Sequence, residues 1–152
     1  MEYHANGKLI LLGEHFVVHG TPALALPLKA KSTRVTVSRE ADGPLGLTLM
    51  SDLPEDARGL AERVAHAAVE AQGHTDGQWR IQVRSDIPVG FGLGSSAAYC
   101  VALAGALMRG ETGNPVDRQA LNERAHTLEQ LIHGQPSGID DTVAAWGCPV
   151  RF

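Results

Sequence analysis

The middle of the chain contains a run of mostly small residues that could bind an anion: Pro88-Val-Gly-Phe-Gly-Leu-Gly-Ser-Ser-Ala-Ala98. Its three alternating glycines let the backbone take positive φ angles and let a ligand approach the main chain closely. The paired serines open a long apolar run that predicts a helix, whose N-terminus presents unpaired N–H groups and the positive end of its dipole. The natural anion for such a cradle is a nucleotide phosphate. A tight turn capped by Ser95 is the alternative explanation.

Two familiar phosphate-binding patterns do not fit this loop. No lysine follows the last glycine before Ser95, so it is not a Walker A motif, and its spacing differs from the dinucleotide fingerprint G-x-G-x-x-G. The hydroxyl of Ser96 is a candidate Mg²⁺ ligand, the role that Ser or Thr takes in P-loop enzymes. Taken alone, glycines before a helix are weak evidence, and the other polar residues must supply the chemistry.

Two carboxylates of the helical half of the chain are candidates for that chemistry. Glu129 lies at the edge of an apolar helical stripe and is either a solvated surface residue or a hard oxygen ligand for Mg²⁺. Asp140 is a candidate general base that takes a proton from a hydroxyl as it attacks a γ-phosphate. Ser137-Gly-Ile-Asp140 also has the capping-box pattern, with Asp141 as a first-turn acid. Consecutive helical residues point about 100° apart, so only one of the two aspartates can face a site.

Polar residues near the N-terminus complete the candidate set. Lys8 opens an apolar strand, where a buried lysine is costly unless paired, so it predicts an acidic partner nearby. A lysine at the strand edge whose ammonium reaches water is the alternative. Glu14 and His15 follow a glycine bend and could reach a small polar substrate, although a structural role is more common for a lone histidine.

The elements that must position these residues can be read from hydrophobic periodicity. The pattern predicts strands at residues 8–12, 33–39, 47–50 and 79–83, with a turn at 41–44. It predicts helices at 56–72, 96–109, 117–133 and 137–146, and the second of these is apolar almost all round, as in a central buried helix. Strands first and helices later predict an α+β domain with the glycine loop at a strand-to-helix junction.

Composition limits the classes of function. The chain has 152 residues, a net charge of −4 and 20% charged residues, which predicts one soluble globular domain and argues against a nucleic-acid partner. No apolar run approaches the roughly 20 residues that cross a bilayer, and no secretory signal follows Met1, so we expect no membrane association and a cytoplasmic location. Cys100 and Cys148 do not look like a disulfide framework or a metal-ligand pair.

Taken together in this order, three segments resemble the GHMP small-molecule kinases, and among them the mevalonate kinase group. The segments are Gly7-Lys-Leu-Ile-Leu-Leu-Gly-Glu-His-Phe-Val-Val-His-Gly20, the glycine-serine loop, and His133-Gly-Gln-Pro-Ser-Gly-Ile-Asp-Asp141. The resemblance implies the ribosomal protein S5 domain 2-like α+β fold, with an unusual left-handed β-α-β crossover. It also implies ATP and Mg²⁺ as cofactors and an alcohol, mevalonate, as the small-molecule substrate.

The same resemblance assigns roles to individual residues. It implies that Asp140 is the catalytic base and Lys8 its positively charged partner, that Ser96 and Glu129 coordinate Mg²⁺, and that Glu14 and His15 lie near the substrate. The residues that it implies for the ATP phosphates are Pro88, Gly90, Gly92, Leu93, Gly94, Ser95 and Ser96. Departures from the family pattern are Asn6 before Gly7, where proline is common, and Cys148 after Gly147, where a second glycine is usual.

The family's C-terminal domain, with its own glycine-rich motif, has no counterpart in the 152 residues. We therefore expect residues 1–152 to be the N-terminal, ATP-binding and catalytic domain of a longer protein. A domain without its partner should expose an apolar face, so we expect self-association such as a homodimer. Two other functions stay open: a related kinase acting on phosphomevalonate or a sugar-like alcohol, and a nucleotide-binding module without catalysis.

Overall fold

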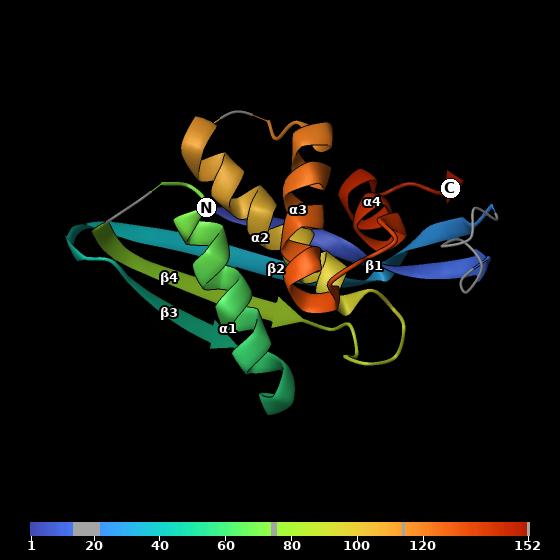
Figure 1. Cartoon of the computed structure of the whole chain (residues 1–152), viewed down its shortest axis with the longest axis horizontal. Helices are drawn as coiled ribbons and strands as arrows, with labels where there is room; N and C mark the ends of the chain where they lie inside the picture. The colour runs from blue at the N-terminus through green and yellow to red at the C-terminus, as the bar shows by residue number, and fades with distance from the viewer. Residues whose placement is uncertain (14–21, 74–75, 114, 152) are drawn as a thin grey trace.

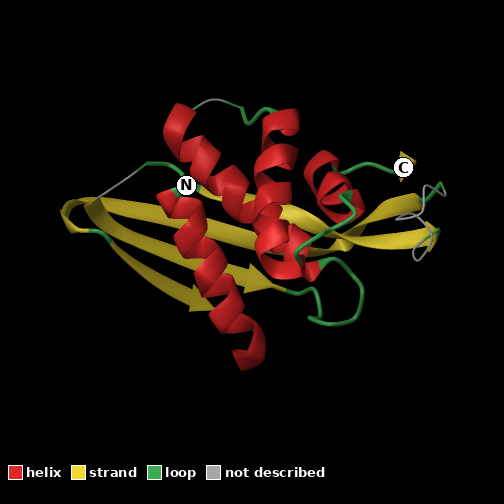
Figure 2. Cartoon of the chain, viewed as in Figure 1, coloured by secondary structure: helices red, strands yellow, loops and turns green. Residues whose placement is uncertain are grey.

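The computed structural model describes residues 1–13, 22–73, 76–113 and 115–151. A mixed sheet forms one layer and four helices cover one of its faces (Figures 1 and 2). The elements in chain order are β1 (Glu2–Leu12), β2 (Leu24–Pro44), β3 (Gly46–Ser51), α1 (Glu55–Glu70), β4 (Asp76–Ser85), α2 (Ser95–Thr112), α3 (Arg118–His133), α4 (Ile139–Trp146) and β5 (Val150–Arg151). The predicted α+β class is confirmed.

The sheet has the strand order β1-β2-β4-β3, and the short β5 pairs with the beginning of β2. All neighbouring strands are antiparallel except β3 and β4, which are parallel and joined through α1. In Figure 1 these two strands point the same way, α1 crosses in front of them, and the chain moves up from β3 to β4. This arrangement is a left-handed crossover, which is rare because most such connections are right-handed.

Strand β2 is much longer than the sequence pattern predicted. The predicted turn at residues 41–44 is wrong, because β2 continues to Pro44, with a register irregularity between Glu40 and Pro44. A second shift lies between β1 and β2, where Asn6 pairs with Ser32 but the next residue, Gly7, pairs with Leu28. Residues 29–31 of β2 therefore have no partner in β1, and the period of two is interrupted there.

Helix α2 is the centre of the core, as its uniformly apolar sequence predicted. Residues 97–108 are all buried, and they pack between the sheet and the outer helices. Tyr99 of α2 donates a hydrogen bond of 2.7 Å to the carbonyl oxygen of Ala61, which ties α2 to α1. A smaller apolar cluster joins α4 to β2, through Ile139 and Val143 on Ala23 and Ala25. This packing fixes the helices that carry the candidate residues over the sheet.

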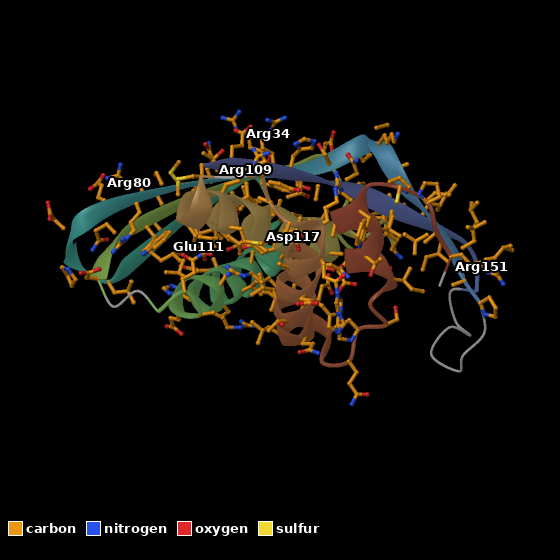
Figure 3. All side chains as sticks on the ribbon, turned by 90° about the horizontal axis from the view of Figure 1, so that it is seen from above. Arg34, Arg80, Arg109, Glu111, Asp117 and Arg151 are labelled. Atoms are coloured by element: carbon orange, nitrogen blue, oxygen red, sulfur yellow. The ribbon has the colours of Figure 1, made fainter. Side chains whose placement is uncertain are left out.

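Among the described residues, no helix covers the opposite face of the sheet. Seen from above in Figure 3, the helices lie on one side of the strands, and the labelled Arg34 and Arg80 lie on the other. Alternation along β4 puts Trp79, Ile81 and Val83 in the core and leaves Arg80 exposed, as a half-buried strand requires. No helix in the described part of the chain is long and apolar enough to cross a membrane.

Candidate active site

The glycine loop connects β4 to α2 and forms a wall of a pocket beside the helices. Its glycines have positive φ angles, 84° at Gly90, 70° at Gly92 and 72° at Gly94, so the predicted left-handed backbone is confirmed. Gly94 is the N-cap of α2 and no side chain caps the helix, so the alternative of a turn capped by Ser95 is wrong. The first N–H groups of α2 are therefore left without a side-chain partner at the pocket.

The pocket has a volume of about 440 Å³ and two chemically different parts. One part is polar, with the loop from Val89 to Ser96, His133 and Asp140. The other part is mainly apolar and comes from the start of α1 and the helices beside it; its members are Leu53, Ala57, Leu60, Ala61, Tyr99 and Ile132, together with the acidic Asp56. An anion at the loop could thus carry an apolar or aromatic group into the second part.

Six of the seven residues predicted for the phosphates line this pocket, and Pro88 does not. The six are Gly90, Gly92, Leu93, Gly94, Ser95 and Ser96. Pro88 lines a separate cavity of about 230 Å³ with Asp52 and Ser85, at the end of β4. Its position before the loop suits a rigid connection better than a ligand contact.

Strand β1 and the glycine loop approach each other unusually closely. The backbone N–H of Lys8 donates to the carbonyl oxygen of Leu93 at 2.9 Å. A Cβ on Gly7 would lie 2.8 Å from that same oxygen, and a Cβ on Gly94 would lie 2.7 Å from Lys8 Cγ. These two positions require glycine because nothing larger fits between the strand and the loop. The contact places Lys8 directly beside the phosphate-binding loop.

Lys8 is buried, with 3% of its surface exposed, and its ammonium group forms an ion pair with Asp140. The Lys8 Nζ to Asp140 Oδ1 distance is 3.0 Å, so the prediction of an acidic partner is confirmed and the alternative of a water-exposed lysine is wrong. Asp140 retains 36% exposure of its side chain and lines the pocket. A carboxylate held by a buried cation at the mouth of an anion site can accept a proton from a bound hydroxyl.

Asp140 and Asp141 point in different directions from the first turn of α4, as the helical period requires. Asp141 is 1% exposed, and its Oδ2 lies 2.7 Å from His126 Nδ1 on α3. The capping-box alternative is wrong, because Gly138 is the N-cap and no side chain caps α4. Ser137 Oγ only accepts a 3.4 Å hydrogen bond from Ile139 N. Of the two aspartates, Asp140 alone lines the pocket.

Glu129 is buried at 3% exposure, so the surface interpretation of this residue is wrong. Its Oε1 has no hydrogen-bond partner, and its Oε2 lies 3.6 Å from His133 Nε2. Burial raises the pKa of Glu129; the Ser96 hydroxyl and His133 oppose this shift, and the charges of Asp141 and Asp140 add to it. A buried carboxylate oxygen without a partner next to a serine hydroxyl is a donor set that suits a hard cation.

Ser96 and Glu129 come together through His133. Ser96 Oγ lies 3.1 Å from His133 Nε2, and that nitrogen is also the neighbour of Glu129. Within the described residues, no group of three or more His, Cys, Asp or Glu side chains is arranged to hold a metal ion. A Mg²⁺ ion would therefore need oxygens from a bound phosphate in addition to these two, which is its usual coordination in kinases.

Two predicted residues lie outside the described part of the chain, and some residues of the site were not predicted from the sequence. Glu14 and His15 lie outside the described residues. His133 and His126 were missed, and Asp141 was predicted only as a first-turn acid; all three contact predicted residues or lie beside them. His133 follows Glu129 by one helical turn, a spacing that brings side chains together, so this neighbour could have been found. His126 and Asp141 are on different helices, and nothing in the sequence pairs them.

Comparison with known families agrees with this geometry. The family model of the GHMP kinases N terminal domain matches residues 59–147, which is more than half of the chain. This chain belongs to the GHMP kinases. The predicted family and its α+β fold are thereby confirmed, and the matched region contains the glycine loop, Glu129 and Asp140.

Individual GHMP kinases show the same relationship. The chain is 31% identical to the mevalonate kinase of Mus musculus and 36% identical to that of Thermococcus gammatolerans, over 97% of its length in both cases. The structure of mevalonate kinase from Staphylococcus aureus superposes with a TM-score of 0.79 at 31% identity, over 99% of this chain and 52% of that one. That of L. major mevalonate kinase in complex with R-mevalonate gives 0.83 at 25% identity, over 99% of this chain and 48% of that one. The chain spans about half the length of the curated relatives it matches.

Proposed function

We propose that this chain is the ATP-binding and catalytic part of a mevalonate kinase, which transfers the γ-phosphoryl group of ATP to the primary hydroxyl of mevalonate. The observation that carries this proposal is the Lys8–Asp140 ion pair beside the glycine loop, with a 3.0 Å contact on the wall of a 440 Å³ pocket. The similarity to mevalonate kinases supports the choice of acceptor. The product would be 5-phosphomevalonate, a precursor of isoprenoids.

The pocket suggests how ATP would bind. The N–H groups of the loop and of the first turn of α2 would hold the phosphates, since they meet the α2 dipole at its positive end. The apolar part beside α1 would hold the base, with Leu60 and Tyr99 in contact with it. The γ-phosphate would then lie toward Asp140, at the polar end of the same pocket. Positioning of this kind supplies much of the rate in phosphoryl transfer.

We propose that Ser96 and Glu129 hold Mg²⁺ together with phosphate oxygens. When bound, the ion would neutralise charge on the transferred phosphoryl group. Glu129 fits this role because its buried Oε1 lacks a hydrogen-bond partner and the Ser96 hydroxyl lies close by. A bound cation would stabilise the ionised form of this carboxylate, which burial disfavours in the free protein.

Asp140 would accept the hydroxyl proton while the substrate oxygen forms a bond to the γ-phosphorus and the bond to the β-phosphate oxygen breaks, releasing ADP. Lys8 would hold the carboxylate in place through its 3.0 Å contact, and as a cation beside the loop it would favour the negative charge of the transferred group. Glu14 and His15 remain proposed contacts to mevalonate.

The whole-protein context is also part of the proposal. We infer that residues 1–152 are the N-terminal domain of a longer kinase, which is supported by relatives of which the chain covers about half the length, and that this kinase is cytoplasmic. The exposed Leu11, Leu12 and Phe91 support a covering partner, either a second domain or the second copy in a homodimer. Light scattering of the 152-residue chain tests the homodimer, because a strictly monomeric chain at high concentration would contradict it.

A substrate panel tests the reaction itself. The full-length protein with ATP and Mg²⁺ should phosphorylate mevalonate in clear preference to phosphomevalonate and sugar-like alcohols. Preference for another alcohol would reject mevalonate as the substrate but would still support a kinase activity. Titration of Mg-ATP into the 152-residue chain separates the remaining alternative, since binding without turnover in the full-length protein would indicate a nucleotide-binding module.

Replacement of Glu129 by Gln tests the proposed metal ligand. The folded-state pKa of Glu129 is raised above the ordinary value of 4.5. Its protonated form therefore contributes to folding stability below pH 4.5, and this contribution is lost as the pH rises through the folded-state pKa. Without Mg²⁺ at neutral pH, Glu129→Gln should therefore raise Tm, by about 2–4 °C for each kcal/mol relieved. The Tm difference should shrink as pH falls toward 4.5, and the variant should lose the Tm gain from Mg-ATP. An unchanged Mg-ATP response would contradict the assignment.

A further inference from the structure

Polar side chains on one face of α3 form hydrogen bonds to α4. Arg118 donates to the carbonyl oxygens of Ala145 and Trp146, both at 2.7 Å, and Asn122 donates to Thr142 Oγ1 at 3.3 Å. His126 continues this face at the same spacing of four residues and meets Asp141. We call Arg118, Asn122 and His126 the polar seam. Figure 1 shows the two helices side by side along it.

The His126–Asp141 contact differs from the rest of the polar seam because its acceptor is a buried carboxylate. Asp141 is 1% exposed, whereas the His126 side chain is 34% exposed at the edge of the contact. An ionised carboxylate only accepts hydrogen bonds, so His126 Nδ1 carries the hydrogen across the 2.7 Å distance. Burying a carboxylate without a hydrogen-bond donor costs free energy, so His126 must keep a suitable distance and direction to Asp141.

Helix α4 is short, so each directional contact has a large influence on its rotation. It has eight residues, begins at a left-handed Gly138 without a side-chain cap, and packs its apolar side through Ile139, Val143, Ala144 and Ala145. Apolar packing has no preferred direction, whereas a hydrogen bond loses its strength steeply when misaligned. Asp140 and Asp141 leave consecutive residues about 100° apart, so fixing one of them fixes the other.

We propose that His126 is a positioning residue: its hydrogen bond to Asp141 sets the rotation of α4 and thereby holds the Asp140 carboxylate toward Lys8 and Glu129. His126 precedes Glu129 by three residues, so the same bond links the helix of the proposed metal ligand to that of the proposed base. The consequence for the rate rests on the proposed function, whereas the rotation of α4 does not.

The experiment uses three variants and two independent readouts. His126→Leu removes the donor, His126→Asn keeps a donor near the place of Nδ1, and the double variant His126→Leu with Asp141→Leu removes both partners without leaving a buried charge. The full-length protein labelled with 5-fluorotryptophan reports on α4 through the ¹⁹F resonance of Trp146, its last residue, while Trp79 in the sheet serves as an internal reference. Steady-state kinetics gives kcat and the KM for ATP.

Both leucine variants should shift or broaden the Trp146 resonance, leave that of Trp79 in place, and lower kcat by about 10- to 100-fold with the KM for ATP within about twofold. His126→Asn should restore both readouts. If His126→Leu does not fold, the double variant provides the test, because a well-packed apolar pair can preserve stability without a directional hydrogen bond.

Asn122→Ala is the matched control, since it removes another bond of the polar seam and leaves Asp141 paired. It should lower Tm and leave kcat and the Trp146 resonance unchanged. A double variant with wild-type kcat and an unmoved Trp146 resonance would overturn the proposal, as would an equal loss of kcat in Asn122→Ala. If the Trp146 resonance shifts in the variants but the protein has no kinase turnover, the role of His126 in the rotation of α4 is retained and the kinase function is rejected.

Discussion

Asp140→Asn is expected to reduce turnover by about 10²–10⁴-fold while leaving the affinity for Mg-ATP within about threefold. The amide has the size of the carboxylate, and its oxygen can still accept a hydrogen bond from Lys8, which lies 3.0 Å from Asp140 Oδ1. What the variant loses is the ability to take the hydroxyl proton. The measurement is kcat from a coupled ADP assay, together with a calorimetric Kd for Mg-ATP.

Asp52→Asn is the control for this experiment. Asp52 accepts a 3.0 Å hydrogen bond from the backbone N–H of Ser85, and the oxygen of an asparagine preserves that bond outside the pocket. Turnover should therefore stay near the wild-type value. An Asp140→Asn protein with unchanged turnover would rule out Asp140 as the base, whatever its effect on ATP binding.

Gly94→Ala is expected to cause the second large effect, a loss of both stability and Mg-ATP binding. Alanine at φ 72° costs about 1–2 kcal/mol, and its Cβ would lie 2.7 Å from Lys8 Cγ, which adds about 1–3 kcal/mol of steric strain. Because Lys8 is buried, it cannot move away without disturbing its contact with Asp140. Denaturant unfolding and Mg-ATP titration should show the loss, with affinity reduced at least about tenfold.

Gly92→Ala separates backbone strain from the steric clash. Its φ of 70° is nearly the same as that of Gly94, but a Cβ there meets nothing within 4 Å. We expect Gly92→Ala to cost only the backbone strain of alanine at a positive φ, about 1–2 kcal/mol of unfolding free energy. Equal destabilisation by the two variants would show that the close approach of Lys8 to the loop contributes nothing to stability.

Local patterns in the sequence predicted the parts of the site that depend on local structure. Glycines at alternate positions predicted the left-handed loop, and the apolar pattern of residues 96–109 predicted the buried central helix. A lysine in an apolar strand predicted its acidic partner, because burial of an unpaired charge is too costly. Each of these inferences depends on a property of one segment or one side chain.

Features that arise between segments could not be predicted in this way. Glu129 lies at the edge of the apolar stripe of its own helix, and in the structure it is buried, with Ser96 of α2 and Asp140 and Asp141 of α4 among its neighbours. The cap of α4 is Gly138 rather than Ser137, since the backbone turns left-handed at Gly138 and the Ser137 hydroxyl accepts only a long bond of 3.4 Å from Ile139 N. The His126–Asp141 bond joins two helices whose relative placement is a property of the tertiary structure.

The register shift between β1 and β2 has a consequence for changes in chain length. Along β1, Ala5 and Gly7 are buried, and so is Lys8, whereas Leu9 is exposed, so the inward-facing phase changes at the unpaired residues 29–31 of β2. Shortening that segment would favour regular alternation along β1, in which the consecutive residues Gly7 and Lys8 cannot both face the core. A short deletion in a neighbouring strand would thus act against the burial of the lysine, although every residue of the pocket would remain in the sequence.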